Sequence, residues 1–240
     1  KYIEQAIDKG AVLIVCSKKC KYLNKNIPII KTSNIRFFLG KIASKFFKLK
    51  PKNLIAVTGT NGKTSVVDLF FQILTLNNIS VASIGTLGIK YKNKIIKTNL
   101  TSPDTVLLHK SLEQIKKNKI DNVIFEASSH GIHQKRIDHL NLKAAVFTNF
   151  SQDHLDYHKT MNSYLKCKLR LFENILPKNK IIISDKSIKE FKILNKISKK
   201  RNLRLLDIGD TKIRIKKNKN LNLNEFQLKN LSMAIVAAKI

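Results

Sequence analysis

Residues 57–65 read Val-Thr-Gly-Thr-Asn-Gly-Lys-Thr-Ser, between an apolar strand predicted at 54–58 and a helix predicted at 63–76. Phosphate-binding loops lie between a strand and a helix in this way. Their glycines let backbone N–H groups turn inward, and the helix N-terminus adds partial positive charge. The Lys reaches the β- and γ-phosphates, and the hydroxyl that follows it reaches Mg²⁺. Val57 stands where the usual spacing has its first Gly, so the loop is a variant built on two later glycines. The stretch predicts nucleotide phosphate binding rather than a chance turn.

Strands and helices alternate beyond this loop. The predicted strands span 54–58, 80–84, 122–126, 144–148, 180–184, 204–208 and 212–216, with a hairpin at 88–98. The predicted helices span 63–76, 102–117, 162–174, 188–200 and 227–239. Such alternation is typical of an α/β fold with a mostly parallel sheet and helices on both faces.

A smaller unit precedes the loop. Its predicted elements are a helix at 3–9, strands at 11–15 and 27–30, and a helix at 34–47 that Asn34 caps. The stretch 49–53 contains a Pro among basic residues and marks the boundary. We therefore expect part of a small α/β domain at 1–50 and a larger domain at 51–240.

The composition narrows the class of protein. The 240 residues are 43% hydrophobic, which argues for a globular core rather than disorder. The net charge of +30 invites a nucleic-acid interpretation, but Arg is rare, Trp is absent and aromatic residues are 7%. No apolar run reaches the ~18–20 residues of a membrane span. Three cysteines without a CxxC pattern favour a reduced cytoplasmic setting, and we expect no nucleic-acid or membrane partner.

Residues 126–136 read Glu-Ala-Ser-Ser-His-Gly-Ile-His-Gln-Lys-Arg and begin where a buried strand ends. Ligands gather at such strand ends in open α/β sheets, and a carboxylate at Glu126 suits Mg²⁺. The polar groups that follow suit an anionic, oxygen-rich substrate. They belong to Ser128, His130, Gln134 and Arg136. Taken alone, the stretch also fits a polar loop with a capping Ser.

Residues 148–158 read Thr-Asn-Phe-Ser-Gln-Asp-His-Leu-Asp-Tyr-His and also follow an apolar strand. Their two His and two Asp residues resemble a transition-metal cluster, but zinc normally needs a third close ligand and a catalytic Glu. A single His beside a Mg²⁺-nucleotide is the alternative. On the predicted helix 162–174, Lys166, Lys168 and Arg170 form, from the pattern alone, a solvated basic face.

In this order, the four stretches resemble the ATP-dependent Mur ligases of peptidoglycan synthesis. The loop at 58–64 is shared across that superfamily, whereas the stretches at 126–136 and 147–158 are similar to members that act on UDP-N-acetylmuramoyl-L-alanyl-D-glutamate. Residues 1–50 resemble the latter part of the family's uridine-binding N-terminal domain, and 51–240 its central ATPase domain. From the resemblance, we expect residues 1–240 to lack the family's C-terminal domain, which selects the added amino acid.

The resemblance implies a role for each matching residue. ATP would be bound by Gly59, Thr60, Asn61, Gly62, Lys63, Thr64 and Asn149. Mg²⁺ would be held by Thr64, Glu126, His154 and a carbamylated Lys168 (N6-carboxylysine). The UDP-linked substrate would contact Thr101, Ser102, Ser128, Gln134 and Arg136. The catalytic set would be Lys63, Glu126, His154 and Lys168. Carbamylation makes chemical sense, since a bare ammonium repels Mg²⁺ and a carbamate supplies an anionic oxygen ligand.

The implied reaction is the ATP-dependent formation of an amide bond through an acyl phosphate. The acceptor would be UDP-N-acetylmuramoyl-L-alanyl-D-glutamate and the incoming group a diamino acid, meso-2,6-diaminopimelate or L-lysine, with the former favoured by its frequency in the family. We expect a cytoplasmic monomer that needs the C-terminal domain to complete the reaction. Two alternatives stay open: another ligase of the superfamily, of the cyanophycin or folylpolyglutamate type, and a basic nucleic-acid-binding NTPase.

Overall fold

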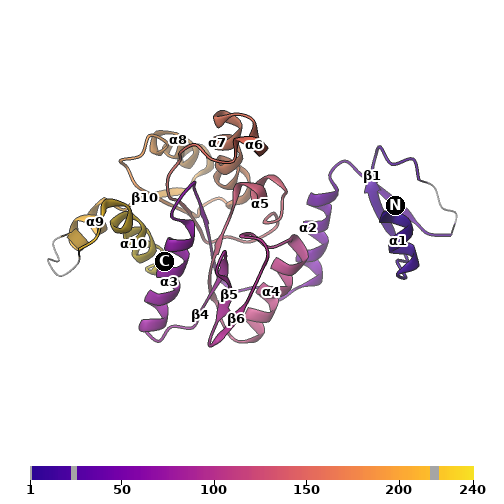
Figure 1. The fold of residues 1–240 in the computed structure, drawn as a ribbon, viewed down its shortest axis with the longest axis horizontal. Helices are drawn as coiled ribbons and strands as arrows, with labels where there is room; N and C mark the ends of the chain where they lie inside the picture. Colours follow the sequence, from indigo (N-terminus) through magenta and orange to yellow (C-terminus); the bar gives the residue numbers. More distant parts are fainter. Residues whose placement is uncertain (1, 23–25, 217–221) are drawn as a thin grey trace.

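The computed structural model describes residues 2–22, 26–216 and 222–240, and a large sheet forms its centre. The strands of this sheet are β3 (Asn53–Thr58), β4 (Val81–Gly85), β5 (Gly88–Tyr91), β6 (Lys94–Ile96), β7 (Asn122–Glu126), β8 (Ala144–Phe147), β9 (Ile181–Ser184) and β10 (Arg204–Asp207). Their order across the sheet is β10-β9-β8-β3-β7-β4-β5-β6. The strands from β10 to β4 run parallel, and β5 and β6 add an antiparallel edge. The expected mostly parallel α/β sheet is confirmed (Figure 1).

Helices cover both faces of the sheet. They are α3 (Lys63–Leu76), α4 (Thr105–Lys117), α5 (Ser129–His133), α6 (Leu155–His158), α7 (Met161–Arg170), a π-helical turn (Leu171–Ile175), α8 (Phe191–Arg201), α9 (Gly209–Lys216) and α10 (Glu225–Ala238). No helix among the described residues is long and apolar enough to cross a membrane.

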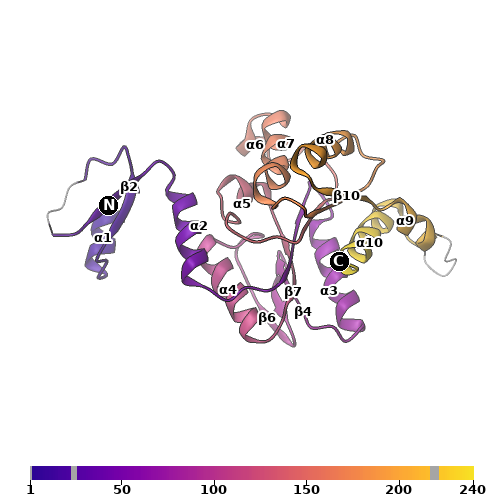
Figure 2. The same cartoon turned by 180° about the vertical axis from the view of Figure 1, so that it is seen from behind.

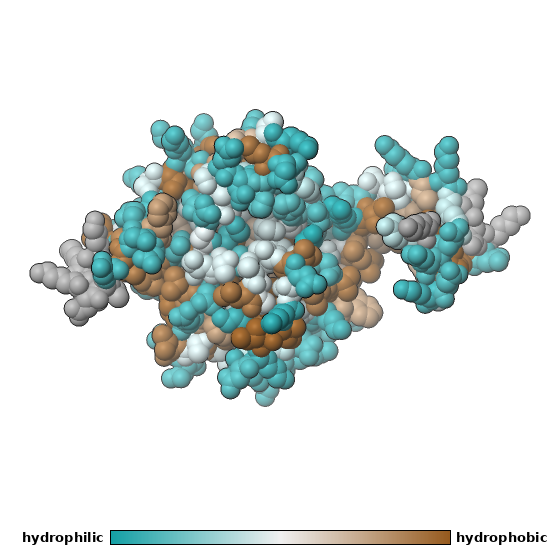
Figure 3. All heavy atoms as spheres, in the orientation of Figure 1, coloured by the Kyte–Doolittle hydropathy of each residue, from teal (hydrophilic) through white to brown (hydrophobic). Residues whose placement is uncertain are grey.

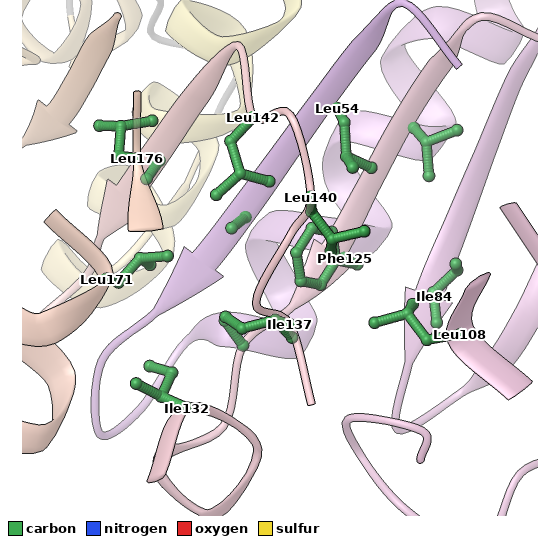
Figure 4. Packing of buried hydrophobic residues seen from close by; sticks show 14 of the residues in the cluster. Leu54, Ile84, Leu108, Phe125, Ile132, Ile137, Leu140, Leu142, Leu171 and Leu176 are labelled. Atoms are coloured by element: carbon green, nitrogen blue, oxygen red, sulfur yellow. The ribbon is translucent and has the colours of Figure 1, made fainter. Parts of the chain in front are cut away.

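Two hydrophobic cores lie on opposite faces of the sheet. One core packs α3 and α10 against the strands, through residues such as Val66, Phe70 and Met233. The other packs α4, α7 and α8 against the opposite face, with Leu108 and Phe125 fully buried (Figure 4). Strands covered on both faces need continuous apolar sequence, which is why β7 and β8 read as near-unbroken hydrophobic runs.

The central strand β3 places the phosphate-loop motif at the middle of the sheet edge. It pairs with β7 on one side, where Val57 lies opposite Glu126, and with β8 on the other, where Thr58 lies opposite Phe147. Because all three strands are parallel, their carboxyl ends meet at one edge. The three polar stretches that follow these strands therefore converge.

The N-terminal unit stands apart from this body (Figures 1 and 2). It contains α1 (Tyr2–Asp8) and a parallel pair of strands, β1 (Ile14–Ser17) and β2 (Ile29–Thr32), followed by α2 (Ile35–Phe46). Asn34 caps α2 as predicted, since its side chain accepts a hydrogen bond from the Phe37 N–H at 3.0 Å. Helix α2 packs on α4 and connects the two parts.

One predicted strand is wrong. Residues 212–216 alternate Lys or Arg with Ile, the period of a half-buried strand, yet they belong to helix α9. Strand β10 is the outermost strand of the sheet, and the segment after it packs against α10, where Lys212 pairs with Glu225 at 2.6 Å. Alternation alone does not make a strand when no neighbouring strand is there to pair with it.

Candidate phosphate and metal site

The loop after β3 has room only for glycine at two positions. Gly59 and Gly62 have φ angles of +144° and +82°, in the region that side chains disfavour. A Cβ at Gly59 would lie 1.9 Å from the Thr148 hydroxyl oxygen, and one at Gly62 would lie 2.5 Å from the Asn230 side-chain oxygen. The loop is therefore enclosed by the segment after β8 and by α10.

The segment after β8 fixes the backbone of this loop. Asn149 accepts from the Thr60 N–H with its carbonyl and from the Asn61 N–H with its side chain, both at 2.9 Å. The Thr148 hydroxyl donates to the Asn61 carbonyl at 2.6 Å. Asn149 thus holds the loop in shape.

Two lysine ammonium groups converge on one carbonyl oxygen of the loop. The Gly59 carbonyl accepts from Lys63 Nζ at 3.1 Å and from Lys168 Nζ at 2.6 Å, and Lys63 also reaches the Thr60 carbonyl at 2.8 Å. Two positive charges this close repel each other, which favours the uncharged form of one of the two lysines.

Burial sets the protonation of these lysines. The Lys168 side chain is only 1% exposed, and burial together with the nearby Lys63 charge lowers its pKa to about 7. Burial also lowers the pKa of Lys63, and the Glu126 carboxylate opposes that change. Lys168 lies over the ring of Tyr164, with Nζ 4.3 Å from the ring centroid. A substantial fraction of Lys168 is therefore an uncharged amine near neutral pH.

A hydroxyl and a carboxylate meet in the same cavity as the two lysines. The Thr64 hydroxyl donates to Glu126 Oε2 at 3.0 Å, and the Thr86 N–H donates to Glu126 Oε1 at 2.7 Å. The cavity measures about 130 Å³. Its lining includes Lys63, Thr64, Thr86, Thr101, Glu126, Ser128, His154, Tyr164 and Lys168. The four stretches singled out from the sequence thus contribute to one site, together with Thr86 and Thr101.

These groups fit a Mg²⁺ ion bound together with phosphate. Mg²⁺ prefers a few protein oxygens and completes its shell with water and phosphate oxygens. Thr64 and Glu126 offer a hydroxyl and a carboxylate within hydrogen-bond distance, and His154 lines the same cavity. Within the described residues, no group of three or more His, Cys, Asp or Glu side chains is placed to hold a metal ion.

The substrate residues expected from the resemblance form a connected chain beside the cavity. The Ser102 hydroxyl is buried and bonds the Glu126 carbonyl at 2.8 Å and the Ser128 hydroxyl at 3.0 Å. Arg136 donates to the Ser102 carbonyl at 2.8 Å and holds the Gln134 side chain through two hydrogen bonds. The Ser102 hydroxyl makes hydrogen bonds inside the protein, whereas Thr101 lines the cavity.

Three residues of the site were missed from the sequence. Thr86 directly follows β4, so the strand-end rule that singled out Glu126 would have found it. Tyr164 lies one helical turn before Lys168, a spacing that places side chains together on a helix. Asn230 is distant in sequence, and no local pattern brings it to Gly62.

Comparison with known proteins identifies the family of this chain. Residues 57–238 match the family described as the Mur ligase middle domain. The chain is 40% identical over 213 residues to the UDP-N-acetylmuramoyl-L-alanyl-D-glutamate--2,6-diaminopimelate ligase of Rickettsia bellii, across 87% of this chain and 44% of that protein. The ligase of the same name from Rhizobium meliloti is 41% identical over 177 residues, 74% of this chain and 36% of that protein. The chain spans less than half the length of these relatives.

Solved structures agree in fold. A UDP-N-acetylmuramoyl-L-alanyl-D-glutamate--2,6-diaminopimelate ligase superposes with a TM-score of 0.80 at 24% identity, over 98% of this chain and 53% of that one. A Mycobacterium tuberculosis folylpolyglutamate synthase complexed with ADP and AMPPCP gives a TM-score of 0.62 at 15% identity, over 85% of this chain and 58% of that one. Identities this low establish the fold alone. With the family match over 57–238, they lead to one conclusion: this chain belongs to the Mur ligase family and carries its middle domain.

Proposed function

We propose that this chain is the ATP-binding part of a ligase that adds a diamino acid, 2,6-diaminopimelate, to UDP-N-acetylmuramoyl-L-alanyl-D-glutamate. The names of the most similar relatives support the substrates, and the site supports ATP with Mg²⁺. The reaction is an amide-bond synthesis that contributes to peptidoglycan precursors. We place it in the cytoplasm, where ATP is made, and expect a monomer.

One observation carries the nucleotide assignment. Lys63 Nζ lies on the Gly59 and Thr60 carbonyls of the glycine loop, and the Thr64–Glu126 pair lines the same cavity as Lys63. A triphosphate with its Mg²⁺ presents the complementary pattern, an anionic chain with one divalent cation. The glycine loop and the start of α3 add backbone N–H groups that point toward the phosphates.

In this mechanism the residues of the chain mainly position the reacting groups and neutralise the charge of the phosphates. Lys63 exchanges loop carbonyls for phosphate oxygens, and the loop N–H groups orient the phosphate chain. Thr64, Glu126 and His154 would hold Mg²⁺, which would supply positive charge against the phosphate oxygens. A phosphoryl group would move from ATP to the substrate carboxylate, and ADP would leave. The amine of the diamino acid would then attack the acyl phosphate. The tetrahedral intermediate would lose the amine proton and inorganic phosphate as the amide bond forms.

Lys168 is proposed to carry a carbamate. The uncharged amine attacks CO₂, a C–N bond forms, and the amine releases a proton to give the anionic N6-carboxylysine. A pKa of about 7 supplies the uncharged amine at neutral pH. The modification removes one of two adjacent positive charges and adds an oxygen donor beside the Mg²⁺ site.

The acceptor substrate is proposed to lie on the chain of polar residues beside the cavity. Thr101 faces the cavity, and Ser128 lines it next to Glu126. Gln134 and Arg136 offer an amide and a guanidinium, groups that suit the carboxylates and amides of a UDP-linked peptide. Residues 1–50 are proposed as part of a uridine-binding domain and 51–240 as the ATP-binding domain.

Binding of Mg²⁺-ATP to a Lys63→Ala variant tests the nucleotide assignment. We expect at least a 100-fold weaker Kd by calorimetry with an unchanged thermal midpoint, because Lys63 binds only loop carbonyls in the free protein. Lys166→Ala, an exposed residue on α7, is the matched control and should bind as the wild type does. Equal affinity in the Lys63 variant would reject the phosphate-loop assignment.

A further inference from the structure

Thr86 lies between the proposed metal carboxylate and the proposed substrate loop. It is the first residue of the tight turn between β4 and β5, in which Gly85 pairs with Gly88. Its N–H donates to Glu126 Oε1 at 2.7 Å, and its hydroxyl lies 3.3 Å from Glu126 Oε2. The same hydroxyl lies 3.3 Å from the Thr101 hydroxyl.

The turn is shaped to bring Thr86 against this carboxylate. A Cβ at Gly85 would come within 2.2 Å of Glu126 Oε1, so the backbone passes directly over the carboxylate because Gly85 has no side chain. Gly88, with a φ of +92°, closes the turn. The sequence Gly-Thr-Leu-Gly therefore places one particular hydroxyl over Glu126.

Residues 97–104, here called the substrate loop, are connected to two parts of Glu126, its backbone carbonyl and its carboxylate. Ser102 bonds the backbone carbonyl of Glu126 directly at 2.8 Å. Thr101, the residue before it, reaches the carboxylate of Glu126 only through Thr86. A displacement of this loop therefore reaches the carboxylate through the Thr86 hydroxyl.

The chemistry of the groups makes the two contacts of the Thr86 hydroxyl depend on each other. This hydroxyl has one proton and two acceptors within reach, Glu126 Oε2 and the Thr101 hydroxyl, so it donates to one of them at a time. A substrate anion that accepts a hydrogen bond from the Thr101 hydroxyl changes the competition for the Thr86 proton. This alters how Thr86 holds the Glu126 carboxylate.

We propose that Thr86 is a positioning residue that couples binding of the acceptor substrate at Thr101 to binding of Mg²⁺-nucleotide at Glu126. This inference rests on the proposed function, because it takes the acceptor and Mg²⁺-ATP as the two ligands. Thr86 itself need not touch either reacting group. Its role is to make each ligand sensitive to the presence of the other.

Calorimetry on the native protein tests the coupling. The Kd of a non-hydrolysable ATP analogue with Mg²⁺ is measured with and without saturating UDP-N-acetylmuramoyl-L-alanyl-D-glutamate. We expect a ratio of about 5- to 20-fold in the wild type, within the usual range of coupling between sites. Thr86→Val keeps the N–H to Glu126 and the shape of the side chain but loses the hydroxyl, and its ratio should fall below about 2-fold. Thr86→Ser restores the hydroxyl and should restore the ratio.

Thr98→Val is the matched control. Its hydroxyl belongs to the same loop but bonds the Leu100 carbonyl, so the coupling ratio should stay at the wild-type value. A merely structural role of Thr86 would lower the thermal midpoint of Thr86→Val and leave the ratio unchanged. If Thr86→Val does not fold, Thr86→Ala replaces it in the same comparison.

The outcomes separate the two proposals. Wild-type coupling that persists in Thr86→Val overturns the inference, and so does a wild-type ratio of one when both ligands bind. A wild-type protein that binds no Mg²⁺-nucleotide overturns the proposed function, and this inference with it. Loss of the ratio in Thr86→Val with recovery in Thr86→Ser supports it.

Discussion

His109 is an uncharged base in the protein interior. It is 0% exposed, and its Nδ1 lies 3.0 Å from Lys50 Nζ. Burial, together with the charges of Lys50 and His139, lowers the pKa of His109 to about 4. An unfolded His takes up a proton near pH 6.5, so between pH 6.5 and 4 the unfolded state holds more protons than the folded state. Stability therefore falls as the pH is lowered through this window.

We expect this single residue to lower the free energy of unfolding by about 2–3 kcal/mol between pH 7.5 and pH 4.5. Urea unfolding at both pH values measures the change. His109→Gln cannot take up the proton, so the drop in this variant should be smaller by about that amount. An equal drop in both proteins would show that other groups govern acid stability.

Lys168 gives a second prediction at the scale of one residue. Lys168→Ala should lower ligase activity of the native protein by at least 100-fold, because the proposed carbamate oxygen is lost. Short carboxylates such as formate or acetate should restore part of this activity, since they supply an oxygen donor to the vacated space. Lys166→Ala, two residues away and exposed, should keep full activity.

For single residues, the sequence pattern predicted site positions only where polar side chains directly follow a predicted strand. It predicted a site around Glu126 and His154, and the structure places both on one cavity. It read Lys168 as part of a solvated face, although the side chain is buried, and only the family resemblance singled it out. A helical pattern does not tell which basic residue turns inward when the helix packs against a polar site.

At the scale of elements, an ion pair anchors the segment after α5 to α7. Arg170 donates to the Ile132 carbonyl at 2.9 Å and forks onto both carboxylate oxygens of Asp138, whose side chain is 5% exposed. Removing one partner leaves the other charge buried and unpaired. The segment that carries Gln134 and Arg136 depends on this anchor.

Arg170→Ala should therefore destabilise the protein by about 3 kcal/mol, the usual cost of breaking a buried pair. Chemical denaturation gives the value. The exposed Lys166→Ala on the same helix should change stability by no more than about 0.5 kcal/mol. A similar small change in Arg170→Ala would mean that water replaces the guanidinium at no cost.

Long hydrophobic patterns predicted helices and strands well, whereas helices of only a few residues were not predicted. The strands and helices around the phosphate loop lie within a few residues of their predicted bounds, because apolar runs and end signals agreed. Helices α5 and α6 were missed, since five and four residues are too short to show a helical period. The predicted helix 162–174 includes a π-helical turn from Leu171, which a 3.6-residue period cannot anticipate.

At the scale of the whole molecule, the net charge of +30 leads to a prediction about binding to DNA. Hydrophilic residues cover much of the face in Figure 3, with hydrophobic patches between them. If the excess Lys serves no nucleic acid, binding to double-stranded DNA at 150 mM salt should be no tighter than about 10⁻⁵ M and independent of sequence. Anisotropy titrations at several salt concentrations measure it, and a sequence-specific complex would revive the nucleic-acid alternative.

The position of β3 in the sheet also determines at what stage of folding the protein can bind a nucleotide. Its two neighbours, β7 and β8, begin about 70 and 90 residues later in the chain. Contacts between such distant segments form slowly, because a long loop must close before any pairing compensates the lost entropy. A nascent chain that has formed only its first helices has the glycine loop but lacks its carboxylate and its second lysine. Nucleotide affinity should therefore emerge as one of the last events of folding on the ribosome.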